Sequence, residues 1–172
     1  MEPSAALLDL AVRGVDEFDG IELNAHNTGV ELFVADAGMF DVAESTFALH
    51  ALAHEVRDEV LTALAPKVGV LAVVEFDVPD LSGEERLRFL AETYERGLAE
   101  YDADRELVAQ GFLMPVLTGQ LLPGAVRSTW EQPAVTWVEQ VARAGFTDVT
   151  VTPLYDHWWS PAFLLTASGR SL

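Results

Sequence analysis

The sequence predicts an α/β fold with a mostly parallel sheet that ends in an antiparallel hairpin. Half of the 172 residues are apolar, which is enough for the core of one ordinary domain. Apolar runs alternate with helical patterns, and this alternation is typical of a parallel sheet with helices on both faces. The last two apolar runs are joined by residues 153–161 alone, too short a connection for a parallel crossover, so this pair is predicted to form a hairpin.

Six apolar runs have the composition expected of strands. They cover residues 6–12, 20–23, 30–34, 68–76, 148–152 and 162–166.

Three segments are predicted to be helices. Apolar residues between 45 and 65 recur at spacings of three and four, and Pro66 follows as a stop signal. Ser82 is a favourable cap for a long helix over 83–109, and Gly145 ends a helix over 129–144. Residues 112–123 are apolar but interrupted by proline and glycine, which indicates a loop or lid.

Charge restricts the classes of partner. The net charge of -18 repels a phosphate backbone and disfavours anionic membranes, so we expect neither a nucleic acid nor a membrane as partner. There is no cysteine, no apolar stretch of roughly 20 residues, and an acidic rather than basic start. The absence of cysteine does not fix the compartment, and the other two features favour a cytoplasmic protein.

The chain is predicted to form a single domain over residues 1–172, because no linker or repeat interrupts it. Within that domain, we expect residues 1–39 to form abbreviated strands on the cofactor side. Residues 82–130 are expected to form a helical or lid-like insertion.

Several motifs, taken in order, resemble class I S-adenosylmethionine (SAM) methyltransferases, which have a Rossmann-like sheet. They are Gly-Ile-Glu-Leu-Asn at 20–24, Val-Ala-Asp-Ala at 34–37, Phe-Asp-Val-Ala-Glu-Ser-Thr-Phe-Ala-Leu-His at 40–50, Leu-Ala-Pro at 64–66 with Gly-Val-Leu-Ala-Val-Val-Glu at 69–75, and the ending 137–169. The resemblance covers residues 40–169 best.

The resemblance implies SAM as cofactor and methyl transfer to a small molecule. By position, it assigns cofactor contacts to four carboxylates: Asp9, Glu22, Asp36 and Glu44. In the family, the counterpart of Glu22 holds the ribose and that of Asp36 faces the adenine. The catalytic candidates are His50, Tyr155 and His157.

The sequence departs from the family at its front. A glycine-rich turn should follow the first strand so that the backbone can approach the cofactor, but only Gly14 is present there. Ala11 and Glu22 are eleven positions apart, whereas dinucleotide folds place the ribose acid about 20 residues beyond the turn. We therefore expect a fold truncated on its amino-terminal side, with strands that pair differently or without the usual SAM pocket.

Several candidates also have a structural interpretation. His50 and His54 have the i, i+4 spacing of a metal pair but lack a third ligand, so surface or packing roles are favoured and no metal is expected. The aromatic group at 155–159 either lines a ligand pocket or plugs the end of the sheet. Glu75 at the end of a strand is either a base or a solvated carboxylate.

Three functions remain open from the sequence. The chain is a SAM-dependent methyltransferase, a methyltransferase-like protein that has lost SAM and binds or cyclises a metabolite, or a non-catalytic partner of a full-length relative. A homodimer is a further possibility, because dimerisation covers exposed apolar sheet surface.

Overall fold

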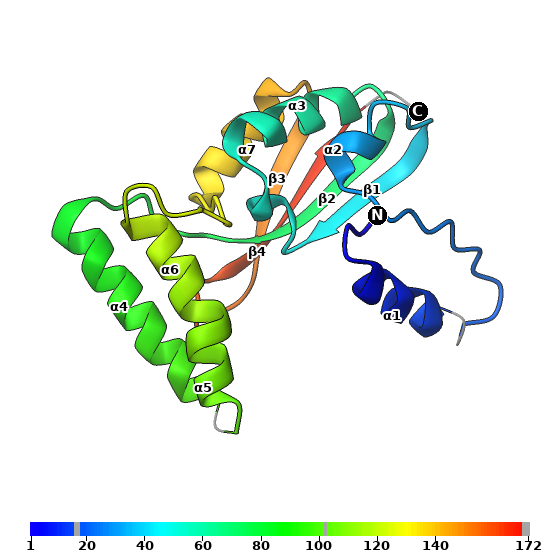
Figure 1. Ribbon diagram of the computed structural model, residues 1–172. Coiled ribbons are helices and arrows are strands. Elements are labelled where there is room, and N and C mark those ends of the chain that lie inside the picture. Colours follow the sequence, from blue (N-terminus) through cyan, green and yellow to red (C-terminus); the bar gives the residue numbers. More distant parts are fainter. Residues whose placement is uncertain (16–17, 102, 170–172) are drawn as a thin grey trace.

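The computed structural model describes residues 1–15, 18–101 and 103–169 (Figure 1). Its helices, in chain order, are α1 (Ala5–Val15), α2 (Val30–Phe33), the 3-10 turn η1 (Leu49–Ala51), α3 (His54–Leu64), α4 (Gly83–Glu100), α5 (Arg105–Val108), the π-helical turn η2 (Ala109–Leu113), α6 (Met114–Leu121) and α7 (Ala134–Arg143).

The sheet has four strands in the order β1-β2-β4-β3. They are β1 (Phe40–Thr46), β2 (Val68–Phe76), β3 (Thr147–Tyr155) and β4 (Ala162–Ser168). β1 pairs in parallel with β2, while β4 runs antiparallel to both β2 and β3. Three strands therefore share one direction and only β4 is reversed, which confirms the predicted mostly parallel sheet with its antiparallel hairpin.

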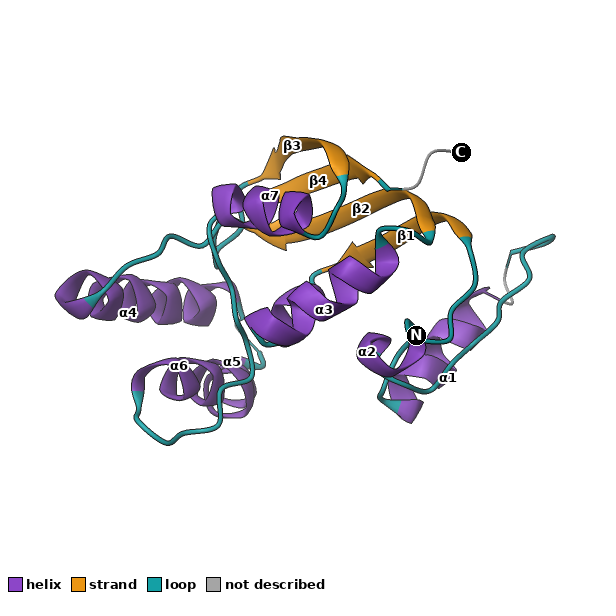
Figure 2. Cartoon of the chain, turned by 90° about the horizontal axis from the view of Figure 1, so that it is seen from above, coloured by secondary structure: helices purple, strands orange, loops and turns teal. Residues whose placement is uncertain are grey.

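The main core lies between the sheet and the two helices α3 and α7. Leu71 and Val73 of β2 alternate inward and pack with Leu61 of α3 and Trp137 of α7. Figure 2 shows both helices on the same side of the sheet.

The opposite face of the sheet carries no helix within the described ranges, so the prediction of helices on both faces is wrong for this part of the chain. Val42 of β1 and Val70 of β2 are register partners on that face, and both are exposed. Nothing in the described ranges covers these side chains.

A second, smaller core lies beyond the carboxyl end of β2, where helices α4 to α6 form a separate layer (Figure 1). Leu90 of α4 packs there with Leu113, Leu117 and Trp159. Most of residues 82–121 lie in helices α4, α5, η2 and α6. Their role as a lid remains a prediction.

The predicted strands in residues 1–39 are wrong. Residues 6–12 lie within α1, residues 20–23 form an irregular segment, and residues 30–33 form α2. The run 6–12 is rich in alanine and leucine, and a short apolar run of that kind fits a helix as well as a strand.

Several predicted boundaries also change. The helix predicted over 83–109 ends at Glu100, and the helix predicted over 129–144 begins only at Ala134. The helix predicted over 45–65 is divided, because β1 extends to Thr46 and α3 begins at His54. The loop predicted over 112–123 is mostly helix, since η2 continues into α6. Pro115 is tolerated because it lies in the first turn of α6, directly after the widened π-turn.

Candidate functional site

A histidine and a buried glutamate form a pair where β1 and β2 end. Glu75 lies near the carboxyl end of β2 and is only 1% exposed, while His50 follows β1 and retains 17% of its side-chain exposure. The backbone N–H of His50 donates to Glu75 Oε1 over 3.0 Å, and His50 Nδ1 lies 2.8 Å from Glu75 Oε2. A carboxylate accepts hydrogen bonds, so it favours the tautomer with the proton on Nδ1.

This pairing leaves His50 Nε2 as the basic nitrogen. No hydrogen bond joins Nε2 to any residue in the described part of the chain. Burial lowers the pKa of His50, but the hydrogen bond and charge of Glu75, together with the charge of Glu131, outweigh burial and raise it above 6.5. The pair therefore presents a partly exposed imidazole that is a stronger base than a free histidine.

A buried arginine fixes the chain segments around this pair. Arg57 of α3 is fully buried and stacks 4.0 Å from the ring centre of Trp137. Its Nη1 donates to the carbonyl of Leu49 over 3.2 Å and to that of Trp130 over 3.1 Å. The N–H of Trp130 in turn donates to the carbonyl of His50 over 2.6 Å. Arg57 thus joins α3 to the two segments that carry His50 and Glu131.

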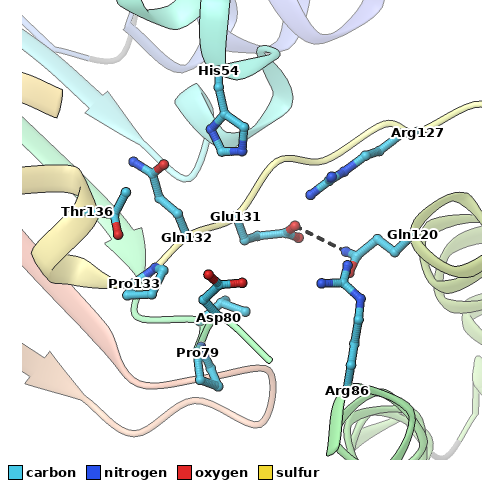
Figure 3. A pocket seen from close by; sticks show the side chains of 11 residues that line it. His54, Pro79, Asp80, Arg86, Gln120, Arg127, Glu131, Gln132, Pro133 and Thr136 are labelled. Carbon is cyan, nitrogen blue, oxygen red and sulfur yellow. Dashed lines mark hydrogen bonds between the residues drawn. The ribbon is translucent and has the colours of Figure 1, made fainter. Parts of the chain in front are cut away.

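A cavity of about 230 Å³ lies beside these segments (Figure 3). Its walls come from α3, the loop after β2, α4, α6 and the segment between α6 and α7. The lining side chains that the picture labels are His54, Pro79, Asp80, Arg86, Gln120, Arg127, Glu131, Gln132, Pro133 and Thr136. We refer to this cavity as the arginine pocket, after Arg86 and Arg127.

Glu131 lines the arginine pocket and does not cap α7. Its Oε2 accepts from Gln120 Nε2 over 3.1 Å. The first N–H of α7, at Ala134, instead donates to Asp77 Oδ1 over 2.8 Å. Asp77, from the loop after β2, therefore satisfies the start of α7.

An aromatic stack extends from the end of β1 to the β3–β4 connection. Phe47 lies 4.3 Å from Phe76, and Phe76 lies 4.9 Å from His157, measured between ring centres. Phe47 has a φ of 48°, which is rare for an aromatic residue, and its N–H donates to the carbonyl of Val74. Such local strain occurs preferentially at functional sites.

The other catalytic candidates lie around this stack. His157 accepts from the N–H of Trp159, and burial lowers its pKa despite the opposing charge of Glu100, so it is neutral near pH 7. Tyr155 ends β3, is 52% exposed and contacts His157 edge-on. The structure therefore places these two residues together, but no contact joins either to His50 among the residues described.

The carboxylates predicted to contact SAM are dispersed. Asp9 lies on α1, Glu22 on an irregular segment and Asp36 in the turn after α2, and all three are exposed. Helix α1 buries no residue and lies beyond the β1 edge of the sheet in both views (Figures 1 and 2). Glu44 alone is on a strand, where the hydroxyl of Thr46 hydrogen-bonds to it.

His50 and His54 do not form a metal-binding pair in the structure. His54 Nδ1 accepts from Arg57 Nη2 over 2.7 Å, and burial together with the charges of Arg57 and Arg127 lowers its pKa. His50 instead pairs with Glu75. In the described ranges, no group of three or more histidine, aspartate and glutamate side chains is placed to hold a metal ion.

Three arginines around the site are not among the residues expected from the sequence: Arg57, Arg86 and Arg127. A signal existed for Arg57, because it occupies the apolar stripe that continues at Val60, Leu61 and Leu64. A charged residue on such a stripe indicates a buried, satisfied group. No comparable pattern identifies Arg86 or Arg127, because only the fold brings α4 against the segment after α6.

Comparison with solved structures identifies the fold of the chain. No protein-family model and no curated protein matches the sequence. Solved structures do: PigF with SAH (17% identity, TM-score 0.56), an O-methyltransferase family protein from Burkholderia thailandensis (15%, 0.60) and the SAM-dependent methyltransferase SibL in its apo form (18%, 0.58). These matches cover 95–97% of this chain and 41–45% of the other chains.

The sheet and its helices therefore have the SAM-dependent methyltransferase fold, and the chain spans less than half the length of those proteins. The carboxylates Asp9, Glu22 and Asp36 are exposed and lie away from strand ends, whereas Glu44 lies on β1. Their contacts with a cofactor remain predictions.

None of the helices in the described ranges combines the length and hydrophobicity that a membrane crossing requires.

Proposed function

We propose that this chain is a SAM-dependent methyltransferase-like protein that acts on a small molecule. The observation that carries the proposal is the His50–Glu75 pair at the carboxyl ends of two parallel strands in a methyltransferase fold. In open α/β sheets this edge is where ligands bind. His50 and Glu75 are proposed to act on the acceptor substrate and not on the cofactor.

The proposed role of His50 is that of general base. An acceptor hydroxyl placed beside Nε2 loses its proton to the imidazole, and Glu75 stabilises the imidazolium that forms. Such a base contributes roughly 10²- to 10⁴-fold to a rate. Arg57, through the carbonyls of Leu49 and Trp130, holds the base and the pocket wall in register.

A second function is favoured by one specific observation. Because Asp9, Glu22 and Asp36 are exposed and lie on separate segments, the alternative is a methyltransferase-fold protein that binds a metabolite without SAM. The same pocket and the same His50–Glu75 pair serve that alternative.

Calorimetric titration with SAM and S-adenosylhomocysteine separates the two functions. The methyltransferase proposal expects saturable binding that weakens in Glu44→Gln, because Glu44 is the candidate cofactor carboxylate that lies on a strand. Glu139→Gln, an exposed carboxylate on α7, is the matched control and should bind as wild type does. No heat with either ligand at roughly millimolar concentration would exclude SAM and leave the alternative.

A further inference from the structure

The arginine pocket brings two arginines of an acidic protein to one cavity, together with two carboxylates. The chain has 10 basic and 28 acidic residues, yet Arg86 and Arg127 line one cavity of about 230 Å³. Figure 3 shows the two guanidinium groups pointing toward the cavity, one from α4 and one from the segment after α6, with the Glu131 carboxylate drawn between them.

Neither arginine is neutralised by an ion pair. Within the described ranges, no carboxylate oxygen lies within 4.0 Å of the guanidinium nitrogens of Arg86 or Arg127. Arg86 donates Nη2 to Gln120 Oε1, and Arg127 donates Nε to the carbonyl of Thr129. Both Nη groups of Arg127 and two of the three guanidinium nitrogens of Arg86 therefore have donors available to a ligand.

The two cations also repel each other. Burial lowers the pKa of Arg127, and the charge of Arg86 lowers it further against the opposing charge of Glu131. An anion between the guanidinium groups relieves that repulsion and receives two charge-assisted forks.

The same pocket also holds hydrogen-bond acceptors. Glu131 and Asp80 both line the cavity, and the Gln120 amide bonds at once to Arg86 and to Glu131 Oε2. A ligand that brought only negative charge would meet these carboxylates unfavourably. A ligand that combines an anionic group with a hydroxyl can meet both the guanidinium groups and Glu131.

We propose that the arginine pocket binds a small hydroxy-carboxylic acid, with its carboxylate between Arg86 and Arg127 and its hydroxyl donating to Glu131. The cavity is smaller than the roughly 300–1,000 Å³ of sites for drug-sized ligands, which suits a single ring with its substituents. His50 does not line this pocket, so the ligand is not the acceptor that His50 is proposed to deprotonate. The binding does not depend on the proposed methyltransferase function.

The proposal is tested by calorimetry on the full chain without SAM. The probes are the three hydroxybenzoate isomers, the corresponding neutral hydroxybenzamides and inorganic phosphate. Arg86→Gln removes one fork and loses only the bond to Gln120. Arg88→Gln is the matched control, because Arg88 is exposed on the same helix and does not line the pocket.

At least one hydroxybenzoate should bind saturably, and the corresponding benzamide should bind at least roughly tenfold more weakly. Arg86→Gln should weaken binding of the same hydroxybenzoate by a similar factor. Arg88→Gln should leave the affinity unchanged. Arg127→Lys, which keeps the charge but loses the planar fork, should also weaken binding, with the melting temperature measured as a check on folding.

The proposal is overturned if the benzamides bind as tightly as the acids, if Arg86→Gln binds as wild type does, or if no acid binds at roughly 10 mM. Tighter binding of phosphate than of every acid would assign the pocket to a phosphate group instead. A failure to bind SAM in the separate titration leaves these outcomes unaffected, so the two proposals fail independently.

Discussion

Replacing Arg57 with methionine should strongly lower the free energy of unfolding. Methionine keeps a side chain of similar length and apolar volume. The guanidinium donates to four acceptors: Gln140 Oε1, the carbonyls of Leu49 and Trp130, and His54 Nδ1. All four bonds are lost in Arg57→Met.

The magnitude depends on which acceptors keep another donor. Gln140 Oε1 still accepts from Gln132, and the Leu49 carbonyl still accepts from the N–H of Leu52. The Trp130 carbonyl and His54 Nδ1 have no second donor in the described ranges. Each costs about 1 kcal/mol when its partner is removed. The lost contact of the guanidinium with Trp137 adds about 1 kcal/mol.

Together these losses predict a decrease of about 3 kcal/mol in the free energy of unfolding, which corresponds to roughly 6–12 °C in melting temperature for a chain of this size. Urea titration followed by circular dichroism measures it. Arg143→Met is the control, because Arg143 is largely exposed and its 3.6 Å contact with Asp58 is worth less than about 1 kcal/mol. A loss in Arg57→Met no larger than in this control would refute the reasoning.

Two further predictions concern packing and pH. A Cβ at Gly119 would lie 2.6 Å from the carbonyl oxygen of Val126, so Gly119→Ala should lower the free energy of unfolding by about 1–3 kcal/mol. A Cβ at Gly111 has no neighbour nearer than 3.7 Å, so Gly111→Ala should be neutral or stabilising. Equal melting temperatures for the two variants would contradict this prediction. The pKa of His50 is raised above 6.5 in the folded protein, so its pairing with Glu75 stabilises the fold fully below pH 6.5, and that contribution disappears as the pH rises through the raised value. The stability difference between wild type and Glu75→Gln should therefore narrow with rising pH, and a constant difference in urea titrations would speak against the pairing.

The carboxyl-terminal part of the fold was predictable because its signals are local. The run 68–76 is long and β-branched, and the short connection 153–161 requires an antiparallel hairpin. Both features survive in the structure as β2 and the β3–β4 pair.

The amino-terminal part was not predictable from pattern alone. Residues 6–12 and 30–34 are short apolar runs that no sheet partner or buried face distinguishes, and both fall mainly in helices. The assignment of Asp9, Glu22 and Asp36 to a cofactor depended on those runs being strands. Without strand ends, the physical argument for these carboxylates is lost.

The site was predictable in part. His50 was identified from the resemblance to methyltransferases, but its partner was not, because a glutamate at a strand end is equally consistent with solvation. Only the parallel pairing of β1 with β2 shows that Glu75 faces His50. Pairs between separate segments of the chain, such as Arg86 and Arg127, leave no periodic signal in a single sequence.

The most direct test of the central claim is an NMR titration of the His50 imidazole in wild type and in Glu75→Gln. If Glu75 prepares His50 as a proton acceptor, the wild-type pKa is above 6.5 and falls when the carboxylate is replaced, because burial continues to lower it. A wild-type value at or below 6.5 that Glu75→Gln does not change would contradict the account.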